Sequence, residues 1–314
     1  MKKMKKTVLI FAAALITSAA QATILRVSNV SNSGAPYTTI PAAISAATEG
    51  DTIMVDGSKT TYTAGNTIEV NKKLVLMGPG YWRTENGIIQ EGANNATIYN
   101  IRFSVDGSTI AGLVVSGAVN VQAAHITITR CRVTGDINHG MPSNGVTNTI
   151  IHQCFLEGDI RGYGNNSYNS GLQITNNIFK GSNYNTVQYF TDSYIAYNTF
   201  TGRMVTNGAL TGCTVEKNVM ESHTGEIGNN TFTDNTETGV TVEDTSTDLA
   251  IKNFSEEYAS QHDASLFSRG AFNGDDPYVI SGLPSGPVVE DITVPASVAM
   301  GSKLNVTIKL GVTK

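Results

Sequence analysis

The stretch LQITNNIFKG, residues 172–181, places apolar side chains at Leu172, Ile174 and Phe179 around two asparagines, and it ends in glycine. Asparagine is a poor strand former, so a single copy of this pattern would indicate a turn. The segment SYIAYNTFTG (193–202) repeats the arrangement 21 residues later. The repetition predicts a repeating structural unit rather than an isolated turn.

Aligning on the asparagine brings six segments into matching rows: STIAGLVVSG (108–117), ITITRCRVTG (126–135), TIIHQCFLEG (149–158), LQITNNIFKG (172–181), SYIAYNTFTG (193–202) and GCTVEKNVMES (212–222). The apolar column before the bend contains Ile110, Ile128, Ile151, Ile174, Ile195 and Val215. The bend column contains Leu113, Cys131, Cys154, Asn177, Asn198 and Asn218, spaced 18 to 23 residues apart. The apolar column after the bend contains Val115, Val133, Leu156, Phe179, Phe200 and Met220.

Short strands that recur at this spacing, with glycines and polar turns between them, predict a stack of coils whose strands run parallel. Equivalent positions then lie about 4.8 Å apart, and stacked asparagines at a bend can pass side-chain hydrogen bonds from coil to coil. A residue next to each asparagine is expected to take the left-handed conformation. A further match at Ile227, Asn230 and Phe232 follows only 12 residues on, which is too short for a full coil, so the register there stays open.

These rows resemble the right-handed parallel β-helix of the pectin lyase-like superfamily, including its internal asparagine ladder. The segment YTTIPAAISAATEGDTIMV (37–55) is similar to the part of those proteins in which an amphipathic helix caps the open end of the coil. Thr39 can cap such a helix, Pro41 suits its first turn and Gly50 can end it. The resemblance covers residues 37–235. It implies an all-β fold, a right-handed single-stranded parallel β-helix with an N-terminal capping helix. Beyond it, we expect a C-terminal tail that contains a strand.

The chain is predicted to divide into four segments: a signal peptide (1–22), the β-helix with its N-terminal cap (23–235), a C-terminal cap region (236–281), and a linker with a terminal strand (282–314). The apolar pieces at 53–55, 67–70, 74–77 and 98–103 are interpreted as earlier coils. The segment NFSEEYASQHDASLF (253–267) is expected to form a helix over the end of the coil. KLNVTIKL (303–310) alternates strictly and predicts a strand with one buried face.

The first residues indicate export. MKKMKK is followed by a short apolar run and a small-residue A-x-A site at Ala20–Ala22, which is the pattern of a secretory signal peptide. Loss of its four lysines changes the formal charge from −5 to −9, and such an acidic surface disfavours nucleic acid and anionic membranes as partners. We expect a periplasmic, cell-surface or extracellular protein whose mature chain does not insert into a membrane. Its three cysteines are too few for a disulfide scaffold, and Cys131 and Cys154 are expected to be free thiols.

Candidate site residues come from the strand that follows each closing glycine. If Ile137, Ile160, Val187 and Met204 point inward, their neighbours point outward, so Asp136 stacks on Asp159 and Asn138 on Arg161. Arg203 lies two coils on. The same face is expected to carry Gln188, and its two longest loops (139–147 and 162–170) are expected to carry His139, Tyr163, Asn165 and Asn166. Asn138, His139, Tyr163 and Gln188 are therefore the candidate substrate-binding residues.

Two stacked carboxylates about 5 Å apart share a proton or bind a cation, so Asp136 and Asp159 are the candidate metal ligands, and calcium is the cofactor they would take. The resemblance implies that Asp136, Asp159, Arg161 and Arg203 are candidate catalytic residues. Lyases of that family use calcium with an Arg or Lys base, and hydrolases use clustered aspartates. Aspartate after glycine is also ordinary turn chemistry. The N-T-D, R-I-K, W-I-D-H and G-x-x-D-F patterns of the family's enzymes are missing.

Three functions stay open from the sequence. The first is an exported envelope protein that binds carbohydrate along one outer sheet without a catalytic motif. The second is a divergent polysaccharide lyase or glycoside hydrolase that acts on an acidic polysaccharide. The third is a structural or adhesin-like module. The fold itself does not choose among them, because function resides in sites.

Overall fold

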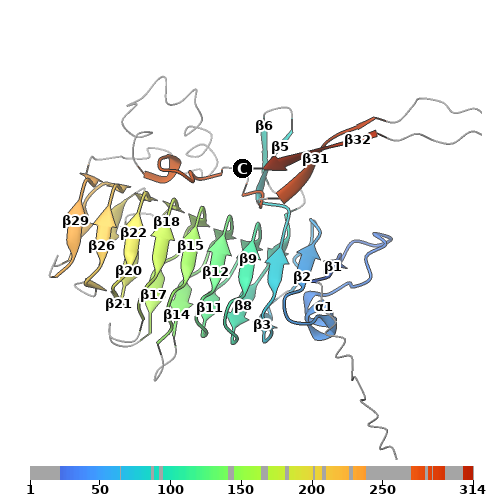
Figure 1. The fold of residues 1–314 in the computed structure, drawn as a ribbon, viewed down its shortest axis with the longest axis horizontal. Helices are drawn as coiled ribbons and strands as arrows, with labels where there is room; N and C mark the ends of the chain where they lie inside the picture. Colours follow the sequence, from blue (N-terminus) through green and yellow to red (C-terminus); the bar gives the residue numbers. More distant parts are fainter. Residues whose placement is uncertain are drawn as a thin grey trace, which may run out of the picture.

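The computed structural model describes residues 22–63, 65–85, 88–91, 95–140, 145–163, 169–180, 184–200, 202–206, 210–225, 229–237, 270–279 and 282–284, and the strands at 286–293 and 307–313. Within these residues the chain forms a parallel β-solenoid (Figure 1), with one short α-helix near its N-terminal end. The predicted stack of parallel coils is confirmed. No described helix has the length and apolar character needed to cross a membrane.

Three parallel sheets form the walls of the solenoid, and from β4 onward successive coils contribute one strand to each wall in turn. Sheet I contains β3 (Thr67–Val70), β8 (Asn100–Phe103), β11 (Val119–Val121), β14 (Ile137–His139), β17 (Ile160–Gly162), β20 (Tyr184–Gln188), β24 (Arg203–Val205) and β28 (His223–Thr224). Sheet II contains β1 (Ile24–Val27), β2 (Thr52–Val55), β4 (Val75–Met77), β9 (Thr109–Ala111), β12 (Thr127–Thr129), β15 (Ile150–His152), β18 (Gln173–Thr175), β22 (Tyr194–Ala196), β26 (Thr214–Glu216) and β29 (Thr231–Thr233). Sheet III contains β7 (Thr97–Ile98), β10 (Val114–Val115), β13 (Arg132–Val133), β16 (Phe155–Leu156), β19 (Ile178–Phe179), β23 (Thr199–Phe200), β27 (Val219–Met220) and β30 (Thr236–Glu237).

Three further strand pairs lie outside these walls. They are the antiparallel pair β5 (Trp82–Glu85) and β6 (Ile88–Glu91), the parallel pair β21 (Phe190–Thr191) and β25 (Leu210–Thr211), and the antiparallel pair β31 (Gly286–Thr293) and β32 (Thr307–Thr313). The predicted strand at 303–310 therefore appears as β32, which begins at Thr307. The helix expected over 253–267 lies outside the described residues.

The three predicted columns line the interior of the solenoid. The isoleucine column from Ile110 to Val215 is paired in register from strand to strand, and its six members are fully buried. In the column after the bend, the rings of Phe179 and Phe200 stack with their centroids 4.3 Å apart. Because each coil contributes the same few inward positions, the core is one continuous apolar cluster along the stack.

The bends between sheets II and III form the predicted asparagine ladder. Asn198 is fully buried, and its Oδ1 accepts the backbone N–H (2.9 Å) and the side-chain Nδ2 (3.0 Å) of Asn177. Asn198 in turn donates through both of its nitrogens to Oδ1 of Asn218. Its Nδ2 also donates to the carbonyl of Ile174 at 2.8 Å. The side chain is thus bonded to both neighbouring coils, as predicted.

The residue before each bend position takes the left-handed conformation, also as predicted. These residues are Gly112, Arg130, Gln153, Asn176, Tyr197, Lys217 and Asp234, with φ values between 51° and 64°. The last coil resolves the open register. Phe232 pairs with Val215, so the bend position belongs to Asn235, whose Oδ1 accepts from Asn218. Asn230 instead accepts the backbone N–H of Cys213 at the preceding corner.

The N-terminal helix α1 (Ile40–Ala46) begins where the sequence places it, but it ends at Ala46 with Ala47 as its C-cap, before the predicted end at Gly50. The Thr39 hydroxyl accepts the N–H of Ala42, and Ile40 and Ile44 join the continuous core of the solenoid. Lys72 donates to three carbonyls at the end of the helix, those of Ile44, Ser45 and Ala47. This contact complements the partial negative charge at a helix C-terminus.

A C-terminal strap, residues 270–279 and 282–284, lies against the outer face of sheet III. It begins with a short 3-10 turn, η3 (Gly270–Phe272), and it forms a second apolar cluster with that face. The cluster consists of Tyr81, Val114, Phe155, Ile178, Ala271 and Tyr278, with Phe272 packed against it. Figure 1 shows η3 and β31 on the same side of the coil stack. This outer wall is therefore covered by the protein's own chain.

The left-handed bend residues hold the strap. Their side chains leave the corner outward, and Asn176 donates to the carbonyls of Ala271 and Asn273. Gln153 donates to the side chain and the carbonyl of Asp276, and Arg130 donates to the carbonyl of Leu283 at 2.8 Å. The strap thus runs antiparallel to the coil order, from later coils to earlier ones. The columns of inward apolar residues gave no indication of it.

The thiols offer a first test of this packing. Cys131, Cys154 and Cys213 are buried and unbridged, as predicted for the first two. Burial raises the pKa of Cys131 to about 12 and that of Cys154 well above its ordinary value. Since the thiolate is the reactive form, iodoacetamide should label the native protein at least about 100-fold more slowly than the urea-unfolded protein. An intact mass two units below that of the all-thiol chain would contradict the free-thiol arrangement.

Candidate ligand-binding face

The outer face of sheet I carries a continuous row of polar side chains. Ile137, Ile160, Val187 and Met204 point inward and are buried, as predicted, so the residues between them face outward. Parallel register places six outward side chains side by side, and we call them the polar row: Glu69, Arg102, Asn120, Asn138, Arg161 and Gln188. The structure therefore brings three predicted site residues together and adds three from earlier coils.

Asp136 and Asp159 form a second row at the corner that precedes the polar row. Asp136 Oδ1 accepts the backbone N–H of Asp159 at 3.0 Å, and Asp159 Oδ1 accepts the N–H of Thr186 at 2.8 Å. Each carboxylate thus ties its own coil to the next, in the same way as the buried asparagines. This is the turn chemistry that the sequence offered as an alternative, extended from one coil to another.

Arg161 lies against both carboxylates. It pairs with Asp159, and its Nη1 is 3.7 Å from Oδ2 of Asp136. Because the guanidinium is 44 % exposed, these ion pairs contribute little to stability. The pairing places the positive charge of Arg161 beside the two carboxylates, where calcium was expected from the sequence.

The metal prediction stays untested. Within the described parts of the chain, no three His, Cys, Asp or Glu side chains come together in a metal-binding group. Asp136 and Asp159 supply two carboxylates, and calcium takes six to eight oxygen ligands. Any ion held here would depend on water or a bound ligand for most of its coordination.

Arg203 does not join this arrangement. It pairs in register with Tyr184, whereas Arg161 pairs with Gln188 on the same strand. Four residues of strand separate these positions, which is roughly 13 Å at about 3.3 Å per residue. Arg203 lies instead at 4.0 Å from Glu221. The sequence placed it two coils away correctly but could not show its displacement along the strand.

The expectation that His139 stands in an outer loop is wrong. His139 is the last residue of β14, two positions after the inward Ile137, and its side chain is fully buried. Its ring meets Phe190 edge-on at 5.4 Å, and neither ring nitrogen has a hydrogen-bond partner among the described residues. Burial lowers its pKa to about 3, with the Ile137 backbone opposing the shift. His139 is thus an interior residue and does not contact a ligand on the face.

Tyr163 extends the face beyond β17. It is 53 % exposed, and its backbone N–H donates to the carbonyl of His139 at 2.7 Å, which fixes the start of the loop. Asn165 and Asn166, expected on the same loop, lie outside the described residues. Tyr163 therefore places an exposed aromatic ring at the edge of the polar row.

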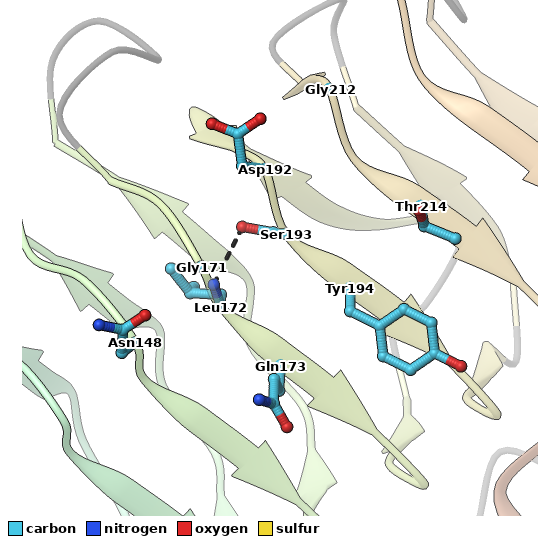
Figure 2. Close-up of a pocket in the computed structure, with 9 residues that line it drawn as sticks. All are labelled: Asn148, Gly171, Leu172, Gln173, Asp192, Ser193, Tyr194, Gly212 and Thr214. Carbon is cyan, nitrogen blue, oxygen red and sulfur yellow. Dashed lines mark hydrogen bonds between the residues drawn. The ribbon is translucent and has the colours of Figure 1, made fainter.

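Sequence reasoning missed a hollow on the outer face of sheet II. It is lined by Asn148, Gly171, Leu172, Gln173, Asp192, Ser193, Tyr194, Gly212 and Thr214 (Figure 2). A signal for it exists in the sequence, because Asn148, Gly171, Asp192 and Gly212 each stand three residues before an inward Ile or Val. Such a column of Asn, Asp and Gly indicates a second left-handed corner.

The function is therefore argued from the fold and the sites alone, because comparison with known proteins found no match. No family model, no curated protein and no solved structure matches the chain.

Proposed function

We propose that this chain is an exported envelope or extracellular protein that binds a polysaccharide along the outer face of sheet I. The observation that carries the proposal is the register of the polar row, in which Asn120, Asn138, Arg161 and Gln188 follow one another on successive coils. Neighbouring strands lie about 4.8 Å apart, so an extended glycan laid along the stack meets one polar side chain per coil.

The chemistry of this row suits sugar hydroxyls. An Asn or Gln amide both donates and accepts, and Arg161 donates, whereas a hydroxyl does either. Each such hydrogen bond contributes only about 0.5–1.5 kcal/mol net, so affinity comes from several coils acting together. The formal charge of −5, or −9 once the expected signal peptide with its four lysines is lost, favours a neutral polysaccharide over an acidic one.

The arrangement supports binding more than catalysis. A lyase needs a base that can accept a proton next to a sugar carboxylate, and Arg161 is held by Asp159 and Asp136. Arg203 lies away from this group along the strand. The lyase and hydrolase alternatives are tested on the polysaccharide that binds. A lyase would release unsaturated products from it, and a hydrolase would release reducing ends.

Binding to the polar row predicts a loss on substitution. A glycan array should first identify a polysaccharide that binds the wild type, and calorimetry should then compare it with Asn138→Ala/Gln188→Ala. Removal of two amides is expected to weaken binding about 10-fold. Thr127→Ala is the control, because Thr127 faces outward from sheet II, and it should leave the affinity unchanged.

Three results would count against this function. Equal affinity of the double variant and the wild type would remove the polar row as the binding face. Product release from the bound polysaccharide, with or without calcium, would favour the enzymatic alternative. Absence of any glycan ligand would leave the structural or adhesin-like role as the better account.

A further inference from the structure

The hollow on sheet II has the size of a small-ligand site. Its volume is about 420 Å³, within the range of about 300–1,000 Å³ that is typical of such sites. It spans β18, β22 and β26 and the corners that precede them. Gln173, Tyr194 and Thr214 are in register across these strands, so they form one wall of the hollow. This face is distinct from the polar row on sheet I.

The floor of the hollow is made by the second left-handed column. Asn148, Gly171, Asp192 and Gly212 have φ values of 57°, 68°, 47° and 67°. A Cβ at Gly171 would lie 2.5 Å from Oδ1 of Asn148, and one at Gly212 would lie 2.7 Å from Oδ1 of Asp192. The two glycines therefore let each polar side chain lie close over the next coil, and their own backbone lines the hollow without a side chain.

The ring of Tyr194 is held in place. Its hydroxyl donates to Oε1 of Glu216 at 2.7 Å, and burial together with this carboxylate raises its pKa. Ser193 completes the floor, because its hydroxyl accepts the N–H of Leu172 and donates to the carbonyl of Thr191. Tyr194 and Ser193 thus keep their positions without a ligand, which lowers the entropic cost of binding one.

Two polar groups at the rim have unused hydrogen-bonding capacity. Among the described residues, neither the Gln173 amide nor the Asp192 carboxylate has a hydrogen-bond partner, and both residues are exposed. Figure 2 shows Asn148, Gln173, Tyr194 and Asp192 arranged around Leu172 and Gly171. The hollow therefore offers an amide, a carboxylate and a fixed aromatic ring around the two glycines.

We propose that this hollow is a second binding site, which takes a neutral mono- or disaccharide unit. A carboxylate and an amide can bind vicinal hydroxyls of a sugar, and a fixed tyrosine ring offers an apolar surface to its C–H groups. Asp192 and Glu216 are both acidic, so a uronic acid is disfavoured at this site. The proposal goes beyond glycan binding on sheet I, since the two faces share no residue.

The test uses methyl glycosides of glucose, galactose, mannose and N-acetylglucosamine as probes, with glucuronate and galacturonate as the acidic set. Titration calorimetry of the full chain should detect at least one neutral glycoside, and the uronates should bind at least about 10-fold more weakly. Gln173→Ala should weaken that binding about 10-fold. Thr127→Ala is the control, because Thr127 lies in the same outward row of sheet II as Gln173, two strands away and outside the lining of the hollow, and it should leave the binding unchanged.

Asp192→Asn keeps the shape and tolerates the left-handed backbone, so it separates recognition from folding. It should reduce the discrimination against uronates while leaving the melting temperature within about 2 °C of the wild type. Failure of all the neutral glycosides to bind, or equal binding by Gln173→Ala and the wild type, would overturn the site. Loss of binding in Gln188→Ala but not in Gln173→Ala would assign the sugar to sheet I alone.

Discussion

Replacement of Asn198 with leucine is expected to lower the free energy of unfolding by about 2–4 kcal/mol. Leucine has the same branching and the same number of side-chain heavy atoms as asparagine, but it neither donates nor accepts a hydrogen bond. The N–H of Asn177, which Asn198 Oδ1 accepts at 2.9 Å, would then be buried without a partner, and the carbonyl of Ile174 would lose its donor. An unsatisfied buried group costs about 1–3 kcal/mol, and the substitution leaves at least two.

Urea unfolding of the wild type and Asn198→Leu measures this loss. The control is Asn138→Leu, which makes the same chemical change on the outer face of sheet I, where water replaces the lost bonds. It should change the unfolding free energy by less than about 0.5 kcal/mol. Equal stability of Asn198→Leu and the wild type would show that the ladder does not hold neighbouring coils together.

Acidification from pH 7.5 to 5.0 is expected to remove about 2 kcal/mol of stability through His139 alone. Burial lowers its pKa to about 3 in the folded protein, against about 6.5 in an unfolded chain. The unfolded state therefore binds the proton first. The contribution is fully present above about pH 6.5, and it is lost as the pH falls below that value towards about 3.

The variant His139→Leu isolates this effect. Leucine cannot bind a proton, so the variant should lose about 2 kcal/mol less than the wild type between the two pH values. It should also be at least as stable at pH 7.5, because no described residue forms a hydrogen bond with the histidine ring nitrogens. His125→Asn is the control, since His125 is exposed, and it should keep the loss seen in the wild type. A pH dependence of His139→Leu equal to that of the wild type would contradict the assignment.

The coil stack was predictable because its rules are local. Apolar residues alternate with period two within a strand, and equivalent residues recur once per coil, so inward columns and outward rows follow from alignment alone. The same alternation, continued two residues beyond Ile137, would have placed His139 inside. The expectation of a loop at His139 came instead from Gly140, which follows it. In the last coil, Asn230 and Asn235 cap two different corners, and the sequence alone did not show which belonged to the ladder.

The remaining features depend on contacts that no local pattern encodes. The displacement of Arg203 follows from the five-residue strand β20, which pairs with β17 near one end and with β24 near the other. The hollow depends on the spatial alternation of two glycines with Asn148 and Asp192. The strap has no repeat of its own, and its position is set by side chains from four separate coils.

The strap also determines how the molecule would carry a mechanical load. It joins the terminal pair β31 and β32 to the solenoid through Leu283, which accepts from Arg130, and through Gly282, which lies close against Tyr81. These attachment points belong to early coils, although the strap follows the last coil in sequence. Tension applied at the C-terminus would therefore enter near the N-terminal half of the stack. The final coils β28 to β30 would be shielded from it until the strap detached.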